Sequence, residues 1–232
     1  MITATNRPRL AVNPMSLAPF HFSDTVADLL ERLGNVAPDR VRLQPAPGTA
    51  AEADVLAAER ESNRLFELVE GVLVEKTMGF RESIVALALA ALLREHVLPR
   101  NLGIVSGPNG MLRLGPGLVR IPNVAFISWA RLPGGRIPTE PIAPIIPELV
   151  IEIISRSNTR AELLRKRTEY FACGVELIWE IDIDARQATI FTSADHAVVT
   201  AAEGALDGDT ILPGFSLELS RLFRELDRQA GD

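Results

Sequence analysis

The sequence has a single cysteine, Cys173, so it can form no disulfide within the chain and no zinc site built from several cysteines. Its three histidines, His21, His96 and His196, are scattered and lack the spacing of metal ligands, which also argues against zinc. The motifs G-x-S-x-G and G-x-G-x-x-G do not occur. Their absence disfavours a serine hydrolase and a dinucleotide-binding domain.

Long hydrophobic runs are missing as well. The longest, Ile84 to Leu93, has ten residues with charged residues on both sides, and it is too short to cross a bilayer. The first fifteen residues lack the apolar segment of a secretory signal. We therefore expect a cytoplasmic protein that does not associate with membranes.

The chain has no excess of positive charge. Its 30 acidic residues outnumber its 24 basic residues, and the net charge is −6. A protein that binds nucleic acid over its whole surface is usually basic, since neutralisation of phosphates dominates the affinity. Composition alone thus favours a metabolic or interaction domain. DNA binding would need a local basic patch, and the best one is Arg160, Arg165, Lys166 and Arg167. Such a run more often solvates one face of a helix.

The hydrophobic pattern divides the chain into an N-terminal part, 1–62, and a main domain, 63–232. We expect a polar arm over 1–22 and then two accessory helices. The first begins after an N-cap at Ser23–Asp24, and the second, over about 51–62, begins after a capping box at Thr49–Glu52.

The main domain alternates strand and helix patterns. We predict a hairpin around Glu70–Gly71, a buried strand with the sequence LVIEIIS, and a helix that begins at Thr159 and ends before Gly174. The remaining elements are a helix over 81–98, strands within 103–129, strands at 175–182 and 188–193, and a closing amphipathic helix. The order β-β-α-β-β-β-α-β-β-α predicts an α/β fold whose helices flank a central mixed β-sheet.

Glu152 is the most unusual residue of this pattern. A carboxylate inside a run of Leu, Val and Ile costs several kcal/mol to bury without a partner. On the helix that follows, Lys166 is a candidate partner, with Glu162 and Tyr170 four residues away on the same face. The pattern alone favours a structural ion pair over a catalytic site.

Several spaced motifs carry a family resemblance. They are GIVSGPNGMLRLGPGLVRIPNVAFISW, PELVIEIISRSNT, LLRKRTEYFACGVELIWEID and LPGFSLELSRLF, in this order. Over residues 65–225 the chain resembles the Uma-type family of restriction endonucleases, a branch of the PD-(D/E)xK nuclease-like superfamily.

The resemblance implies a restriction-endonuclease-like core that hydrolyses DNA phosphodiester bonds with Mg²⁺ or Mn²⁺. It assigns Glu152 and Asn123 to the metal and to catalysis, and Glu82 to an additional acid on the first long helix. An exposed acid in the first turn of a helix is also common without any catalytic role. The superfamily usually has its lysine two residues after the second acid, where this chain has Ile154. Lys166 matches the position from which this family takes its lysine.

One position departs from the family pattern, because Pro122–Asn123 stands where the family has Pro-Asp. Asparagine brings no charge, and Mg²⁺ sites depend on anionic oxygens. The alternative function is therefore a non-catalytic nuclease-fold module that binds proteins or DNA.

Two further hypotheses concern a metal and a partner. The alternating acids Glu180, Asp182 and Asp184 would share one strand face and could hold a metal, although such a run more often ends a strand in a solvated turn. Nucleases that cut both strands generally pair two sites, so we also expect a homodimer. The apolar face of the last helix, LSRLFREL, is available for that contact.

Overall fold

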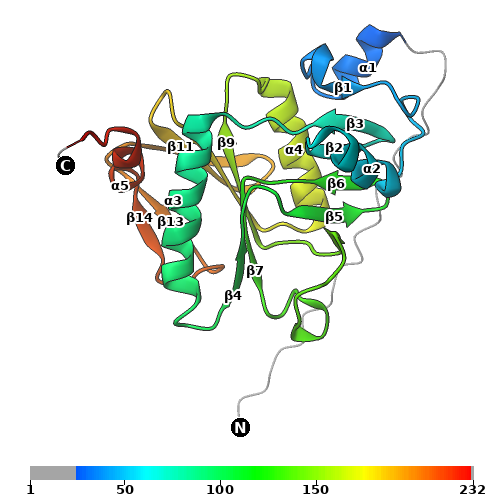
Figure 1. The fold of residues 1–232 in the computed structure, drawn as a ribbon. Coiled ribbons are helices and arrows are strands. Elements are labelled where there is room, and N and C mark those ends of the chain that lie inside the picture. Colours follow the sequence, from blue (N-terminus) through cyan, green and yellow to red (C-terminus); the bar gives the residue numbers. More distant parts are fainter. Residues whose placement is uncertain (1–24, 231–232) are drawn as a thin grey trace.

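The computed structural model describes residues 25–230, and the predicted arm over 1–22 lies outside them (Figure 1). The chain folds into a mixed α/β structure with two six-stranded sheets. Its helices are α1 (Val26–Arg32), α2 (Glu52–Ser62), α3 (Phe80–Val97), α4 (Arg160–Cys173) and α5 (Leu219–Phe223), with 3₁₀ turns at Pro38–Arg40, Pro133–Gly135 and Arg224–Leu226.

The strands fall into three sheets. The first contains β1 (Val41–Arg42), β2 (Phe66–Val69), β3 (Val72–Glu75), β5 (Met111–Gly115), β6 (Leu118–Arg120) and β8 (Ile142–Ala143), in the order β1-β3-β2-β6-β5-β8. The second contains β4 (Gly103–Ser106), β7 (Val124–Ser128), β9 (Leu149–Ile154), β10 (Leu177–Asp182), β11 (Gln187–Ser193) and β12 (His196–Ala201), in the order β12-β11-β10-β9-β7-β4. A small third sheet pairs β13 (Ala205–Asp207) with β14 (Ser216–Glu218).

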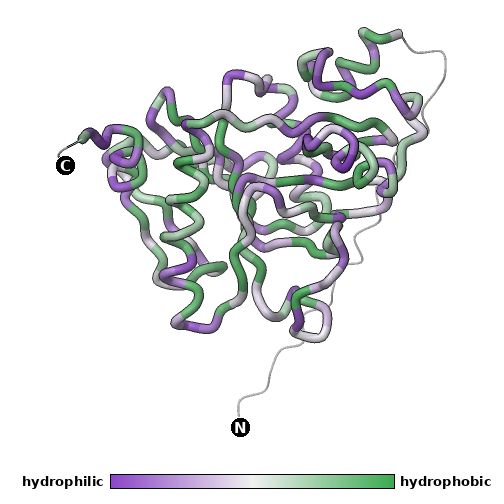
Figure 2. Tube along the Cα trace, in the orientation of Figure 1, coloured by the Kyte–Doolittle hydropathy of each residue, from purple (hydrophilic) through white to green (hydrophobic). Residues whose placement is uncertain are grey.

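The second sheet is the centre of the molecule. Its strand β9 pairs in parallel with β10 and antiparallel with β7, so the sheet is mixed, as predicted. Because side chains alternate along a strand, Ile151 and Ile153 of β9 pack with α3, whereas Val150 packs with Tyr170 of α4. Helices therefore flank both faces (Figure 1). The apolar run of α3 appears mainly green in Figure 2.

The predicted hairpin is confirmed, with a two-residue loop between β2 and β3. Both loop residues have a positive φ, 50° at Glu70 and 70° at Gly71, which is the geometry of a type I′ turn. A Cβ at Gly71 would lie 2.5 Å from the backbone carbon of Gly48, so the position also needs glycine for space.

The end of α4 at Gly174 is confirmed, whereas the N-terminal caps of the accessory helices differ from the predicted ones. Thr159 caps the start of α4 and Gly174 ends it with a φ of 101°. Helix α1 is capped by Thr25, with which Asp28 completes a capping box, and the predicted cap residues Ser23 and Asp24 lie outside the described residues. At α2 the acid that bonds back to the N-cap is Asp54, whose Oδ2 accepts from the Ala51 N–H at 2.7 Å.

The C-terminal region differs most from the prediction. Strands β12 and β13 were not predicted, whereas β14 lies where a strand or turn was expected before the closing helix. That helix is shorter than expected, because α5 gives way to a 3₁₀ turn. Leu219, Leu222 and Phe223 are buried in the core of the same chain with α3. The apolar face that suggested a homodimer is therefore used internally, and the dimer stays a prediction.

The N-terminal part packs closely on the rest. Strand β1 joins the first sheet beside β3, and α2 covers that sheet with Val55 and Ala58. The division at residues 62 and 63 stays a prediction. Within residues 25–230, no helix has both the length and the apolar character that crossing a bilayer requires.

Candidate functional site

The buried acid predicted at position 152 lies in β9, in the middle of the second sheet. It points to the same face as Val150, the face that α4 covers. Only 5% of Glu152 is exposed, so an isolated charge here would be strongly unfavourable. The partners of this carboxylate therefore determine what the site can do.

Hydrogen-bond donors hold both oxygens of Glu152. Its Oε1 accepts from the Tyr170 hydroxyl at 2.8 Å and lies 3.4 Å from Nζ of Lys166. Its Oε2 accepts from Nζ of Lys76 at 3.1 Å. Lys166 and Tyr170, one turn apart on α4, thus reach the same carboxylate, and Lys166 contacts Glu152 directly. Glu162, the other predicted neighbour of Lys166, instead forms a buried ion pair with Arg40 at 2.8 Å.

A second buried carboxylate, Glu67 of β2, lies next to Lys166. Its Oε1 accepts from Nζ of Lys166 and from the N–H of Ile121, both at 3.1 Å, and its Oε2 accepts from Nη1 of Arg120 at 2.7 Å. Lys166 therefore bridges a carboxylate of the first sheet and one of the second. Sequence reasoning missed Glu67, although it too is a single acid within a buried strand, the signal that singled out Glu152.

Six charged side chains make up what we call the ion cluster: Glu67, Lys76, Arg120, Glu152, Lys166 and Glu169. Glu169 joins through Nε of Arg120 at 2.9 Å. Three carboxylates face three cations, so these six charges balance without any further ion. At the edge of the cluster Glu169 also pairs with Arg165, and Arg165 with Glu70, which adds one charge of each sign.

Burial disfavours the charged forms of Glu152 and Lys166, but the opposite charges beside them outweigh it and set the direction of each pKa shift. Burial alone would raise the pKa of Glu152, but Lys166 and Lys76 hold that pKa below its usual value. Burial would lower the pKa of Lys166, yet Glu152 and Glu67 raise it. For Lys76 burial prevails, and its pKa is lowered.

The cluster should make the protein sensitive to acid. The pKa values of Glu67 and Glu152 are lowered from 4.5, so their contribution to stability is complete above that pH and is lost as the pH falls through the folded-state values. We expect the melting temperature to fall below pH 4.5. In Glu67→Gln the acid slope of the unfolding free energy should be flatter by up to about 1.4 kcal/mol per pH unit. Urea titrations at several pH values test this, and equal slopes in both proteins would contradict it.

Asn123 lies one position before the Val124–Ile151 pair that joins β7 to β9, which places it beside Glu152. Its N–H donates to the carbonyl of Ile151 at 3.1 Å, and its Oδ1 accepts from the N–H of Ile153 at 2.8 Å. The side-chain oxygen assigned to a metal by resemblance thus accepts from the backbone after Glu152, while the backbone N–H of Asn123 binds the residue before it.

Glu82 lies in the first turn of α3, at an open pocket of about 490 Å³ that we call the mouth pocket. Its lining residues are Thr77, Met78, Gly79, Arg81, Glu82, Ser155, Arg156, Ser157 and Asp184. Thr77 directly follows Lys76, and Ser155 directly follows β9, so the pocket opens at the strand ends beside the ion cluster. Among the described residues, Glu82 forms no hydrogen bond or ion pair with a cluster member, and its carboxylate folds back over Gly79. This is the arrangement of an acid at a helix N-terminus.

The alternating acids after β10 do not come together. Glu180 pairs with Arg167 at 2.8 Å, and Asp184 pairs with Arg81 at 2.8 Å. Asp182 accepts backbone N–H groups within the turn. Within residues 25–230, no group of three or more acids, histidines or cysteines is placed to hold a metal.

The basic run of α4 is mostly occupied by carboxylates. Arg165 pairs with Glu169 and Glu70, each at 2.8 Å, Arg167 pairs with Glu180, and Lys166 is buried. The run therefore fixes α4 to the sheets instead of forming a free patch for phosphates.

Comparison with known proteins gives the family. The model of the Uma2 family, described as "Putative restriction endonuclease", matches residues 51–220, which is most of the chain. The chain belongs to this family. One similar solved structure is described as "a putative nuclease belonging to DUF820" from Anabaena variabilis ATCC 29413. It covers 71% of this chain and 93% of its own, with 19% identity and a TM-score of 0.64, and it supports the nuclease fold. No curated protein sequence matches the chain.

Membership of the Uma2 family raises the question of whether this centre fits a divalent metal. Mg²⁺ needs near-octahedral oxygen ligands at about 2.0–2.1 Å. Here both oxygens of Glu152 are engaged by Lys76, Lys166 and Tyr170, and the oxygen of Asn123 is engaged by a backbone N–H. Asn123 also brings no charge. The donor set of this Uma2 protein, as arranged here, does not fit Mg²⁺.

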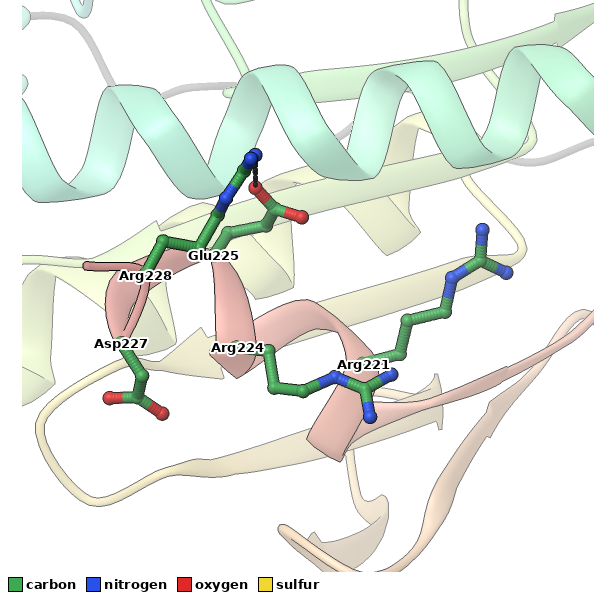
Figure 3. Close-up of a pocket in the computed structure, with 5 residues that line it drawn as sticks. All are labelled: Arg221, Arg224, Glu225, Asp227 and Arg228. Atoms are coloured by element: carbon green, nitrogen blue, oxygen red, sulfur yellow. Dashed lines mark ion pairs between the residues drawn. The ribbon is translucent and has the colours of Figure 1, made fainter. Parts of the chain in front are cut away.

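A pocket of about 580 Å³ at the C-terminal end has no part in this centre (Figure 3). Its lining residues are Arg221, Arg224, Glu225, Asp227 and Arg228, and none belongs to the ion cluster. Arg228 pairs with Glu225 at 3.5 Å, while the side chains of Arg221 and Arg224 extend away from that pair (Figure 3). This pocket offers matched arginines for control variants.

Proposed function

We propose that this Uma2 protein binds DNA through its nuclease fold and does not cleave DNA in Mg²⁺. The observation that carries the proposal is that the side-chain oxygens of Glu152 and Asn123 already accept hydrogen bonds from other groups of the protein. A metal could bind only by breaking several buried bonds to charged groups, which are among the stronger hydrogen bonds in proteins.

DNA would contact the mouth pocket. Arg81 and Arg156 lie there with side chains 51% and 90% exposed, and Thr77, Ser155 and Ser157 add hydroxyl groups. Both arginines pair with Asp184, at 2.8 and 3.5 Å, but Asp184 is itself 51% exposed, so a phosphate can compete for them more easily than for the buried pairs of α4. Arginines and hydroxyls are the groups that most often contact phosphate oxygens. The net charge of −6 is consistent with binding through one local patch and not through the whole surface.

A second candidate function is a weak endonuclease that uses Mg²⁺ or Mn²⁺. Contact between Glu152 and Lys166 favours it, since the resemblance assigns catalysis to this pair. Mn²⁺ should then support more activity than Mg²⁺, because it accepts neutral donors such as the amide of Asn123 more readily.

Charge reversal at the mouth pocket tests the proposed contact. We expect Arg156→Glu to weaken binding of a fluorescent DNA duplex by about tenfold or more and to reduce the salt dependence of the affinity, because it replaces a phosphate contact by a repulsive charge. Arg224→Glu, the matched control at the C-terminal pocket, should have little effect. Anisotropy titrations at two salt concentrations measure both.

The outcomes separate the two candidates. Equal loss of affinity in both variants would mean that the contact is non-specific, and no binding by the wild type would refute the DNA proposal. Nicking of a plasmid by the wild type, abolished in Glu152→Gln, would establish the weak endonuclease in its place.

A further inference from the structure

The chain uses lysine in only two places. Of its 24 basic residues, 22 are arginines, and the two lysines, Lys76 and Lys166, both direct their ammonium groups at Glu152. Other buried carboxylates, such as Glu162, pair with arginine. An ammonium group is a compact point charge, whereas a guanidinium spreads its charge over a planar fork. Glu152 thus receives the cations whose size and shape are closest to those of a metal ion.

Lys76 is fixed in its position. It follows β3 directly, and its N–H donates to the carbonyl of Leu65 at 2.8 Å. The next residue, Thr77, forms a 2.9 Å hydrogen bond between its hydroxyl and that of Ser157. The side chain of Lys76 is only 7% exposed, and its Nζ ends 3.1 Å from Oε2 of Glu152.

The two ammonium groups supply the charge that one divalent cation would bring. Lys166 forms ion pairs with both Glu67 and Glu152. Among the described residues, the ion pair of Lys76 is with Glu152. Lys76 holds Oε2, the oxygen that Lys166 and Tyr170 leave open. Because Asn123 is neutral, a bound divalent cation would add two positive charges to a cluster whose positive and negative charges already balance.

We propose that the ammonium group of Lys76 takes the place of the divalent metal on Glu152, so that the centre folds without metal and excludes it. The inference deepens the proposed function, because it names the residue that keeps this nuclease fold from cleaving. It is tested without DNA, so its failure and the failure of DNA binding are distinguishable.

The competing explanation is an ordinary ion pair that a metal displaces. Amine acetylation of the full-length wild type, read by peptide mass spectrometry, separates the two, because the chain has only two lysines. We expect slow labelling of Lys76 that MnCl₂ does not change. Labelling of Lys76 that rises with MnCl₂ would overturn the proposal.

Calorimetric titration of MnCl₂ gives a second, independent measurement. We expect no saturable binding to the wild type or to Lys76→Arg, which keeps the charge. Binding should appear in Lys76→Met combined with Asn123→Asp, which removes one positive charge and adds one negative charge, a change that one divalent cation offsets. Adding Glu152→Gln to this double variant should abolish the binding.

Folding of each variant is checked by circular dichroism, with Lys76→Gln as a replacement if Lys76→Met does not fold. Wild-type binding as tight as that of the double variant would overturn the proposal. So would a folded double variant that binds no Mn²⁺, because removing the ammonium group would then open no cation position.

Discussion

Replacement of Lys166 by methionine is expected to lower the free energy of unfolding by about 3–5 kcal/mol, the usual cost of removing one partner from a buried ion pair. Methionine is an unbranched side chain one atom shorter than lysine, and it removes the charge together with the hydrogen bonds of Nζ. Lys166 is 2% exposed and bonds to both Glu67 and Glu152, so its loss leaves two buried carboxylates short of a cation. Urea unfolding at neutral pH measures the difference.

Arg64→Met is the matched control. Arg64 also pairs with a glutamate, Glu75 at 3.0 Å, but its side chain is 63% exposed. Exposed pairs contribute about 0–1 kcal/mol, so this variant should remain close to the wild type. A loss at Lys166 no larger than the loss at Arg64 would show that the ion cluster does not stabilise the fold.

Local patterns were sufficient to predict the central elements. The strand β9 and the helix α4 have clear hydrophobic and capping signals, and the loop Glu70–Gly71 has the residues of a tight hairpin. Strand β12 could not be predicted in this way. Its residues are mostly exposed, and it is held by pairing with β11, which leaves little hydrophobic alternation to detect.

The candidate site was predictable only as far as one strand and the helix after it. Glu152 could be identified because a buried charge needs a partner, and Lys166 lies on the next helix. Glu67 lies in the first sheet and Lys76 directly follows its strand β3, and the expectation of a single central sheet did not include this separate sheet. Which sheet packs against α4 depends on contacts between residues far apart in sequence, and no local pattern encodes them.

The double variant Lys76→Met with Asn123→Asp is expected to nick supercoiled plasmid DNA in Mg²⁺ at least about a hundredfold faster than the wild type, a change of about 2.7 kcal/mol in the barrier. Aspartate restores an anionic oxygen beside Glu152, and methionine removes the ammonium group from Oε2. The cluster then carries two excess negative charges, which favours a hard divalent cation. Gel assays of nicked and supercoiled plasmid give the rates.

The single variants identify which change limits cleavage. Asn123→Asp alone should gain little, because Lys76 still holds Oε2 of Glu152. If this single variant cuts as fast as the double variant, Lys76 does not obstruct the centre. Glu152→Gln added to the double variant should return cleavage to the background, because it removes the central carboxylate. If the double variant binds Mn²⁺ in the calorimeter and still does not cut, the metal can enter but the scissile phosphate cannot reach it, and the mouth pocket serves binding alone.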